Sequence, residues 1–298
     1  MKVAVTDVGS NTVKTKIFDC KKNHIEEVFS KVKNTKLISY IENGILSEKG
    51  IFLLCRDLLD LKNSAMKSGY DIFACFATAS LRRTANSDEI KKAVYDFCQV
   101  DIDLISGDDE AFLSFAGVKN TTKNFPDDTL LFDMGGGSTE IILSKNKKIC
   151  FSKSMNFGSL SMHLDFPNND FEGIKDKATE HLKRIAPENI LSKNAVLVGG
   201  TALSINTLYL HTFPKEKPLF MTIDKLKELY ESLKKYDNAV ITLLEEKTPD
   251  RVTTVIPGLA SYMGMLEYCK AENIFVSTSG IREGYVTEKI LKNLEKYI

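Results

Sequence analysis

Tryptophan is absent from the 298 residues, histidine occurs four times, and the six cysteines include no C-x-x-C pair. The histidines show no metal-ligand spacing, so they give no indication of a zinc site. The scattered cysteines argue against a disulfide framework and predict reduced, mostly buried thiols, as is typical of a cytoplasmic protein. No apolar run is long enough to span a bilayer, so we expect no membrane partner.

An excess of either charge is also missing. Lysine and arginine together number 40, as do aspartate and glutamate, so the formal net charge is zero. The overall field does not attract polyanions, so a phosphate-rich ligand needs a local site, and we expect no nucleic-acid partner. Hydrophobic residues at 43% and charged residues at 27% are typical of a soluble globular protein.

The largest positive signal is an internal repeat. The stretches "VAVTDVGSNTVKTKIFDCKKNHIEEV" and "TLLFDMGGGSTEIILSKNKKICFSKS" align without a gap, which pairs Asp7 with Asp133 and Gly9 with Gly135. Each alternates between apolar strand patterns and turns. The repeat predicts two similar α/β domains, at residues 1–122 and 123–298, joined by a polar, proline-containing linker at 119–128.

Helix patterns follow each repeat. Residues 47–67 place apolar side chains on one helical face, and further helices are expected near 171–185, 224–235 and 253–270. Asn86 and Glu89 have the spacing of a capping box, and Ser106 is expected to cap the next helix. The last helix, about 282–297, is expected to pack across the seam between the domains through an apolar stripe of Val286, Ile290 and Leu294.

The two Asp-x-Gly turns suggest phosphate chemistry. Glycines let the backbone turn sharply and come close to a ligand, and the exposed amides of such a turn attract anions. An aspartate there would repel an anion unless a cation such as Mg²⁺ lay between them. The alternative is that each Asp-Gly is a simple hairpin turn. The candidate metal and phosphate ligands are Asp7, Gly9, Ser10, Asn11, Thr12, Asp133, Gly135, Gly136, Gly137, Ser138 and Thr139.

Seven segments together resemble one known family. They are "VTDVGSNTVKTKIF", "LLFDMGGGSTEIIL", "ATASLRRTAN", "LISGDDEAFLSFAGV", "LVGGTALSINTL", "RVTTVIPG" and "VSTSGIREGYV". In these segments and their order the chain resembles the exopolyphosphatase / guanosine pentaphosphate phosphohydrolase (Ppx/GppA) family of the actin-like ATPase and sugar-kinase superfamily. In "ATASLRRTAN", Ser80 and Thr84 replace two alanines of the family pattern. The resemblance implies two duplicated ribonuclease H-like domains with mixed sheets flanked by helices, and an active site in the interdomain cleft.

The resemblance also implies roles for individual residues. It points to Glu110, in "GDDEA", as the general base that takes a proton from the attacking water. The alternative is that these acidic residues have no catalytic role and simply lie in the first turn of a helix. Arg82 would clamp phosphate oxygens through its guanidinium, and Thr78 would donate a hydrogen bond to one of them.

Other polar residues near these motifs have less certain roles. Arg83 is as compatible with an exposed charge as with a function, and Thr253 receives no role. Lys31, Lys33 and Lys36 could form a basic track, although exposed surface lysines are the simpler interpretation for the first two.

The function implied is hydrolysis of a phosphoanhydride. The substrate would be inorganic polyphosphate, shortened from its end, or guanosine pentaphosphate, which would lose its 5′ γ-phosphate, with Mg²⁺ or Mn²⁺ as cofactor. One alternative is a small-molecule kinase of the same superfamily. Another is a non-catalytic nucleotide or polyphosphate sensor, which would have no need of a base at Glu110. A homodimer remains open as a further partner.

Overall fold

The computed structural model describes residues 1–21, 24–122, 125–188 and 190–297. By its packing the chain divides into two units. Unit 1 comprises Met1–Gly117 together with the segment from Ile281 onward, and unit 2 comprises Val118–Gly280. The turn expected within the first repeat, at residues 21–23, and the predicted linker at 119–128 fall partly on residues 22–23 and 123–124, which lie outside the described residues.

Unit 1 is built on a five-stranded sheet with the order β3-β2-β1-β6-β7. The first three strands form the expected antiparallel meander, and β6 and β7 extend it in parallel from β1. The strands are β1 (Lys2–Val8), β2 (Val13–Lys21), β3 (His24–Lys33), β6 (Ile72–Ala77) and β7 (Ile102–Leu104). A small hairpin, β4 (Ile41–Glu42) and β5 (Ile45–Leu46), follows a short 3-10 turn, η1 (Leu37–Tyr40).

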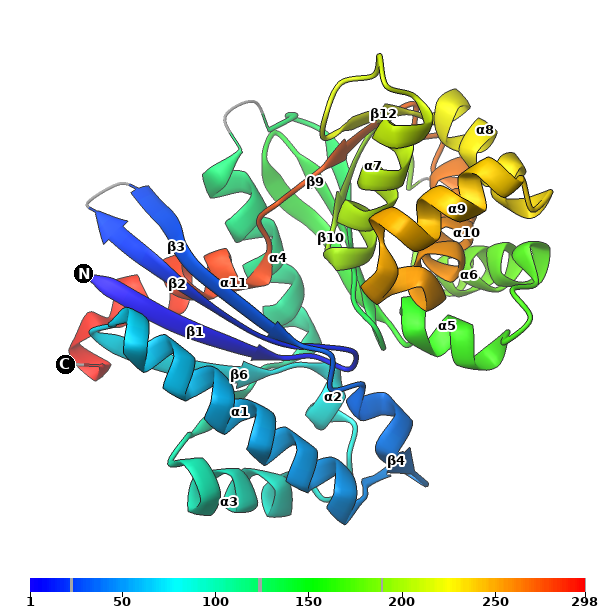
Figure 1. Ribbon diagram of the computed structural model, residues 1–298. Coiled ribbons are helices and arrows are strands. Elements are labelled where there is room, and N and C mark those ends of the chain that lie inside the picture. The colour runs from blue at the N-terminus through cyan, green and yellow to red at the C-terminus, as the bar shows by residue number, and fades with distance from the viewer. Residues whose placement is uncertain (22–23, 123–124, 189, 298) are drawn as a thin grey trace. The chain divides into compact units, whose positions relative to one another are not determined.

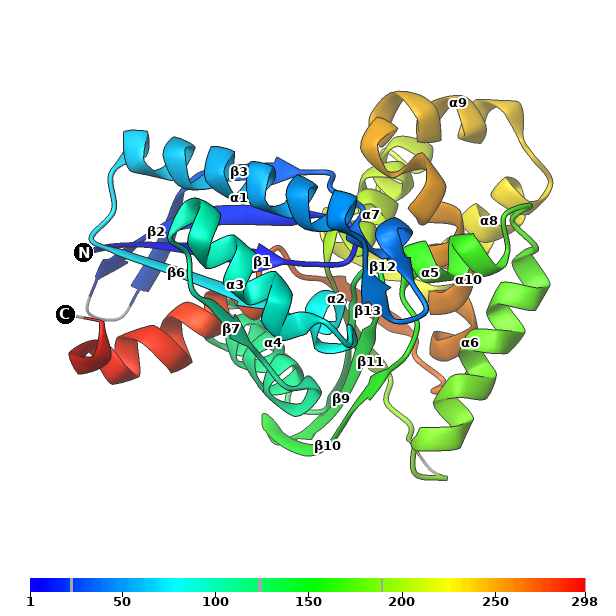
Figure 2. The same ribbon diagram turned by 90° about the horizontal axis from the view of Figure 1, so that it is seen from below.

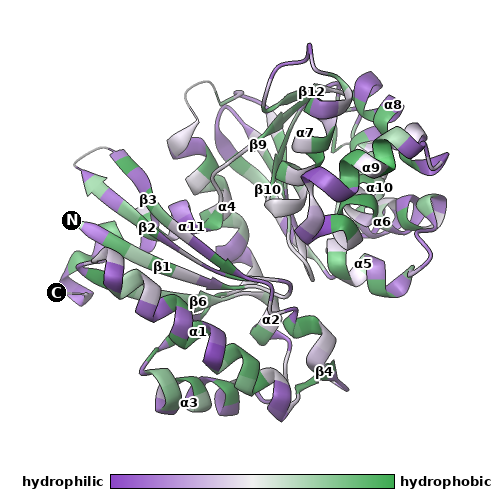
Figure 3. Cartoon of the chain, in the orientation of Figure 1, coloured by the Kyte–Doolittle hydropathy of each residue, from purple (hydrophilic) through white to green (hydrophobic). Residues whose placement is uncertain are grey.

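Helices cover both faces of the unit 1 sheet (Figures 1 and 2). Alternation along the strands sends Val8, Cys75 and Ala77 toward α1 (Glu48–Ser68) and α3 (Ser87–Cys98). Val3, Val5 and Phe76 face the other way, toward α4 (Gly107–Thr121) and the C-terminal segment. Helices α1 and α3 alternate green and purple along their lengths in Figure 3, as amphipathic helices do. The apolar face predicted for α1 is confirmed, because its apolar side chains at four-residue and three-residue spacing are buried: Ile51, Leu54, Leu58 and Leu61.

Unit 2 repeats this plan with a six-stranded sheet in the order β10-β9-β8-β11-β13-β12. Its strands are β8 (Thr129–Met134), β9 (Thr139–Lys145), β10 (Lys148–Met155), β11 (Asn194–Val198), β12 (Phe220–Thr222) and β13 (Asn273–Val276). The helices gather on one side of the sheet (Figure 1). They are α5 (Ser159–Asp165), α6 (Phe171–Ile185), α7 (Gly200–Thr212), α8 (Ile223–Lys234), α9 (Asn238–Lys247) and α10 (Val252–Tyr268).

The predicted duplication is confirmed at the level of strand register. Asp7 lies opposite Lys14 across β1 and β2, and Asp133 lies opposite Glu140 across β8 and β9, which is the same register shifted by one repeat. The turns match as well. The amide of Gly9 donates to the carbonyl of Thr12 at 3.0 Å, and the amide of Gly135 donates to that of Ser138 at 2.9 Å. Both turns are therefore hairpin connections with one shared geometry.

The C-terminal segment differs from the predicted single helix. It consists of a short helix α11 (Ile281–Gly284), a π-helical turn η3 (Tyr285–Ile290) and a 3-10 turn η4 (Leu291–Lys296). Its predicted stripe is buried in unit 1, where Val286 and Ile290 join the core and Leu294 packs against it. The packing thus groups this segment with the first unit, whereas the predicted boundary assigned it to the second domain.

Two local predictions at helix starts have opposite outcomes. Ser106 caps α4 as expected, with its hydroxyl accepting from the amide of Asp109 at 3.0 Å. The capping box at Asn86 is wrong. The Asn86 side chain instead bonds both backbone groups of Leu46, at 3.0 Å each, and so ties α3 to the β4-β5 hairpin. Asn86 also contacts the Glu89 carboxylate at 3.4 Å, but its side chain makes no cap to the α3 backbone.

The cysteines agree with the prediction of mostly buried, reduced thiols. Cys150 is exposed, while Cys20, Cys55, Cys75, Cys98 and Cys269 are buried, and all are free thiols. Among the described residues, no helix has the length and apolarity needed to cross a membrane.

Candidate active site

The candidate residues of unit 1 lie at one edge of its sheet. Strands β1, β6 and β7 run parallel, so their carboxyl ends meet at the same edge. Asp7 lies near the end of β1, Thr78 directly follows β6, and Ser106 follows β7 at the start of α4. Ligands of open α/β sheets bind at this edge. Sequence segments more than 90 residues apart are thus brought together by strand topology.

The first glycine turn is held from outside by the segment after β3. The amide of Lys36 donates to the carbonyl of Asn11 at 2.8 Å, and that of Ile38 donates to Ser10 at 3.1 Å. Lys36 adopts a left-handed conformation, with φ of 51°, to make this approach. Ser10 and Asn11 are buried, while Thr12 is half-buried. The carbonyls of the turn are therefore occupied by protein amides.

Helix α2 (Ala79–Arg82) is fixed to the same turn. Thr78 is its N-cap residue, and its carbonyl accepts from the amides of Leu81 and Arg82. The Ser80 hydroxyl donates to the carbonyl of Val8, at the end of β1. The Thr84 hydroxyl donates to the carbonyl of Leu81 at 2.9 Å. Both hydroxyls that replace family alanines thus have structural partners.

Glu110 and Arg82 contact one another. A terminal nitrogen of Arg82 lies 3.0 Å from Oε2 of Glu110 and also donates to the carbonyl of Ile105 at 2.9 Å. Asp108 is exposed, and the carboxylate of Asp109 accepts from the Ser106 hydroxyl, so Glu110 is the buried member of the three acids. A neighbouring guanidinium favours the ionised form of a carboxylate, which is the form that a general base needs.

Asp7 is held by a residue to which sequence reasoning gave no role. Arg282 of α11 donates to Oδ2 of Asp7 at 2.7 Å, and both side chains are largely buried. Oδ1 of Asp7 is buried and has no hydrogen-bond partner among the described residues. Burial raises the pKa of Asp7, against the opposing influence of Arg282. The motif "SGIREG" was visible in the sequence, but only the fold brings Arg282 to β1.

In unit 2 the second glycine turn packs directly on helix α5. The amides of Ser159, Leu160 and Ser161 donate to the carbonyls of Gly135 and Gly136 at 2.9–3.0 Å. Gly158 permits this approach, because a Cβ there would lie 2.4 Å from the Gly135 oxygen, 2.6 Å from the Gly136 carbonyl carbon and 2.7 Å from the Gly137 nitrogen. The second glycine turn and Gly158 thus pack backbone against backbone. Gly158 was not identified from the sequence as part of the site.

The other predicted residues of this turn have different surroundings. Ser138 is buried, and the buried Thr139 hydroxyl donates to the carbonyl of Phe157 at 2.8 Å, so Thr139 already ties the turn to the segment before α5. Asp133 is half-buried near the end of β8. Gly199, with φ of +104°, lies beside it, since a Cβ at Gly199 would be 3.5 Å from Oδ1 of Asp133.

Arg251 is a further cation that the sequence did not single out. Its guanidinium lies against the first residue of α7, because a Cβ on Gly200 would be 2.3 Å from a terminal nitrogen of Arg251. The hydroxyls of Ser159 and Thr201 are 2.9 Å apart at the same end of the unit. The sequence signal was the arginine that opens "RVTTVIPG", beside which Thr253 is exposed.

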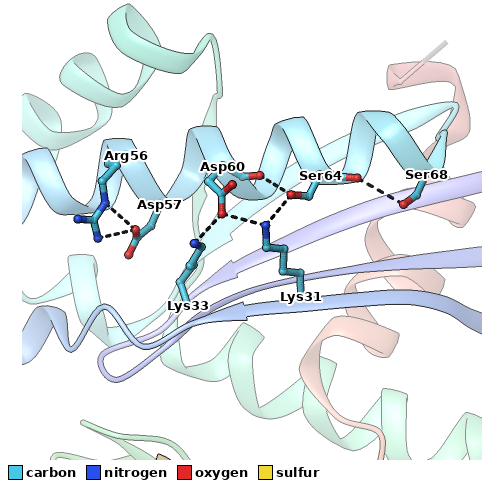
Figure 4. A network of polar contacts seen from close by, with 7 residues as sticks. All are labelled: Lys31, Lys33, Arg56, Asp57, Asp60, Ser64 and Ser68. Atoms are coloured by element: carbon cyan, nitrogen blue, oxygen red, sulfur yellow. Dashed lines mark hydrogen bonds and ion pairs between the residues drawn. The ribbon is translucent and has the colours of Figure 1, made fainter.

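The predicted basic track is not a free cationic surface. Figure 4 shows Lys31 and Lys33 of β3 directed at Asp60 of α1, at 2.9 and 2.6 Å, and Lys31 also bonds Ser64. Their hydrogen bonds lower the pKa of Asp60. Surface pairs of this kind contribute little to stability. Lys36 and Arg83 are exposed.

The candidate protein ligands are too few to fill the coordination shell of a divalent cation. A bound cation would need further ligands from water or from substrate phosphates. Among the described residues, no group of three or more His, Cys, Asp or Glu side chains could hold a metal ion. The available donors are one aspartate per turn, and Asp7 has a buried oxygen without a hydrogen-bond partner. Mg²⁺ suits such a set, because it takes one or two carboxylates and completes its shell with water and substrate phosphates.

The fold has close counterparts among solved structures. An exopolyphosphatase from Cytophaga hutchinsonii superposes with a TM-score of 0.85 over 97% of this chain and 98% of its own, at 18% identity. The α/β class of two duplicated domains that the repeat and the motifs predicted is thereby confirmed.

Sequence comparison identifies the family. A profile of the Ppx/GppA phosphatase family matches residues 16–293, and the chain belongs to this family. A bifunctional 3-dehydroquinate synthase/phosphatase from Fusobacterium nucleatum is 27% identical over 96% of this chain and 46% of its own length. A guanosine-5′-triphosphate,3′-diphosphate pyrophosphatase from Photobacterium profundum is 24% identical over 78% and 51%, respectively. The chain thus spans about half the length of the curated relatives it matches.

Proposed function

We propose that the protein is a phosphoanhydride hydrolase that releases the terminal phosphate of inorganic polyphosphate or the 5′ γ-phosphate of guanosine pentaphosphate. The observation that carries the proposal is the carboxyl edge of unit 1, where a glycine turn, Thr78 and the Arg82–Glu110 pair follow the adjacent parallel strands β1, β6 and β7. The names of the relatives support the choice of substrates, since they include an exopolyphosphatase and a guanosine-5′-triphosphate,3′-diphosphate pyrophosphatase.

The first part of the mechanism is substrate binding. Amides and hydroxyls of the two turns bind phosphate oxygens, as backbone turns of this kind do, while the Gly9 and Gly135 amides and the Thr139 hydroxyl hold the turns in shape through hydrogen bonds within the protein. Thr78 donates to one of these oxygens. Asp7 and Asp133 would hold Mg²⁺, which, when bound, neutralises charge on the phosphate chain. Arg82 offers planar donors that match two phosphate oxygens.

The second part is proton transfer. Glu110 accepts a proton from water as the water oxygen bonds to the terminal phosphorus. The bond from that phosphorus to the bridging oxygen breaks, and its electron pair leaves with the shortened chain. Because Arg82 is paired with Glu110 at 3.0 Å, an incoming phosphate competes for the guanidinium. Transfer of Arg82 to the phosphate would raise the basicity of Glu110 when substrate is present.

The test compares three substrates with one variant as control. Phosphate release is measured with Mg²⁺ from long-chain polyphosphate, guanosine pentaphosphate and ATP, for the parent and for Glu110→Gln. We expect release from at least one of the first two substrates to exceed release from ATP, and to fall by roughly a hundredfold or more in the variant. Release from ATP alone, or equal rates in the variant, would contradict the proposal.

A further inference from the structure

One oxygen of the Asp7 carboxylate, a candidate metal ligand, is already paired with a cation of the protein. Arg282 lies 2.7 Å from Oδ2, and the exposed fractions of the two side chains are 15% for Asp7 and 20% for Arg282. In such a setting water screens the attraction only weakly. A metal ion binding to Asp7 therefore has to compete with a bound guanidinium.

Further charges around this pair oppose a second cation. Lys14 lies directly across from Asp7 on β2, and its charge acts on both Asp7 and Arg282. Glu283, the neighbour of Arg282, is bound to Lys16 at 2.7 Å, and Lys16 also pairs with Glu27 at 2.7 Å. Those acids are therefore committed to Lys16. A divalent ion arriving alone at Asp7 would meet both Lys14 and Arg282.

Arg282 cannot leave Asp7 by movement of its backbone. Ile281 is buried in the unit 1 core, Glu283 is anchored to Lys16, and Gly284 lies against α4, where a Cβ would come within 1.8 Å of the Leu113 oxygen. Residues on either side of Arg282 are thus fixed by packing and charge. Only the side chain can turn, so any exchange of partners at Asp7 is a local change.

We propose that Arg282 is an internal counter-ion that blocks metal binding at Asp7 until a phosphate chain is present. The phosphate supplies the anion that accepts the guanidinium, and Asp7 is then available to a divalent cation. Metal and phosphate consequently bind together at Asp7, and the Asp7 turn does not retain metal alone. The inference rests on the proposed function for its ligands, and it adds an order of binding.

The test measures Mn²⁺ bound to the protein by equilibrium dialysis, first without any phosphate compound. Arg282→Gln should bind Mn²⁺ at least about tenfold more tightly than the parent, because a neighbouring like charge is removed. Arg282→Lys, which keeps the charge, should stay near the parent. Arg184→Gln removes an exposed arginine–carboxylate pair on α6 and serves as the matched control. Equal Mn²⁺ affinity in Arg282→Gln and the parent would overturn the proposal.

A second variant keeps the test decisive if Arg282→Gln fails to fold, as judged by circular dichroism. Asp7→Asn should leave Mn²⁺ binding unchanged without phosphate, and should abolish the extra binding that methylene-bridged diphosphonate induces in the parent. Weaker Mn²⁺ binding by Asp7→Asn without diphosphonate would show that Asp7 is not blocked. These measurements involve no turnover, so the inference and the hydrolase assignment can fail separately.

Discussion

The contact between α11 and α4 gives a sharp prediction about how Glu110 is positioned. A Cβ on Gly284 would lie 1.8 Å from the carbonyl oxygen of Leu113, 2.6 Å from its carbonyl carbon and 3.0 Å from its Cα, whereas ordinary contacts begin at 3.4 Å. Gly284→Ala must therefore open the gap by about 1.6 Å, the difference between 3.4 and 1.8. Leu113 is one helical turn beyond Glu110, so a shift of α4 carries the carboxylate with it.

Two effects should follow from this shift. Overpacking against backbone should lower the free energy of unfolding by about 1–3 kcal/mol or more. Displacement of the base by about 1 Å should lower kcat by roughly a hundredfold. Thermal unfolding followed by circular dichroism and phosphate release at saturating substrate measure the two effects.

A matched glycine provides the control. A Cβ on Gly69 would meet no heavy atom within 4 Å, but the residue has φ of +74°. Gly69→Ala should therefore cost about 1–2 kcal/mol of stability through backbone strain and leave kcat unchanged. If Gly284→Ala kept the parent Tm and kcat, the α11–α4 contact would not position Glu110.

Three other predictions concern single charged residues. Glu110→Gln should retain the parent Tm within a few degrees while turnover falls roughly a hundredfold or more; a few-fold change would exclude it as the base. Asp7→Ala and Asp133→Ala should each raise the Mg²⁺ concentration needed for half-maximal activity, and an unchanged Mg²⁺ dependence in both would remove the metal role. Burial, with Arg282 and Lys16 nearby, lowers the pKa of Lys14 from 10.5 to about 8. Between these values the unfolded chain holds a proton that the folded protein has lost, so the parent's free energy of unfolding relative to Lys14→Met should rise with pH. A difference that is flat across this window, measured by urea unfolding, would contradict the shift.

The repeat made most of the architecture predictable from the sequence. Period-two alternation fixed the meander strands, and the gap-free alignment implied that Asp7 and Asp133 occupy the same register position, as the strand pairing confirms. Apolar spacing gave α1 and its buried face, because both depend on residues close together in the chain. Local signals such as the Ser106 cap were equally accessible.

The remaining features depend on contacts between distant segments. Arg282 reaches Asp7 from 275 positions away, and Asn86 gives up a local cap for Leu46, 40 residues away. The need for glycine at position 158 arises only from its contact with the second glycine turn. Neither composition nor spacing shows which distant segments come into contact. The motifs could therefore be identified from the sequence, but the pairing of their side chains could not be predicted.

The source of the oxygen in the released phosphate tests the central claim most directly. In ¹⁸O-labelled water, a single turnover of polyphosphate or guanosine pentaphosphate should place one label in each released phosphate, because water is the nucleophile. Glu110→Gln should release labelled phosphate roughly a hundredfold more slowly. Unlabelled phosphate, or phosphate transferred to an added hydroxyl acceptor instead of released, would contradict hydrolysis and favour a kinase.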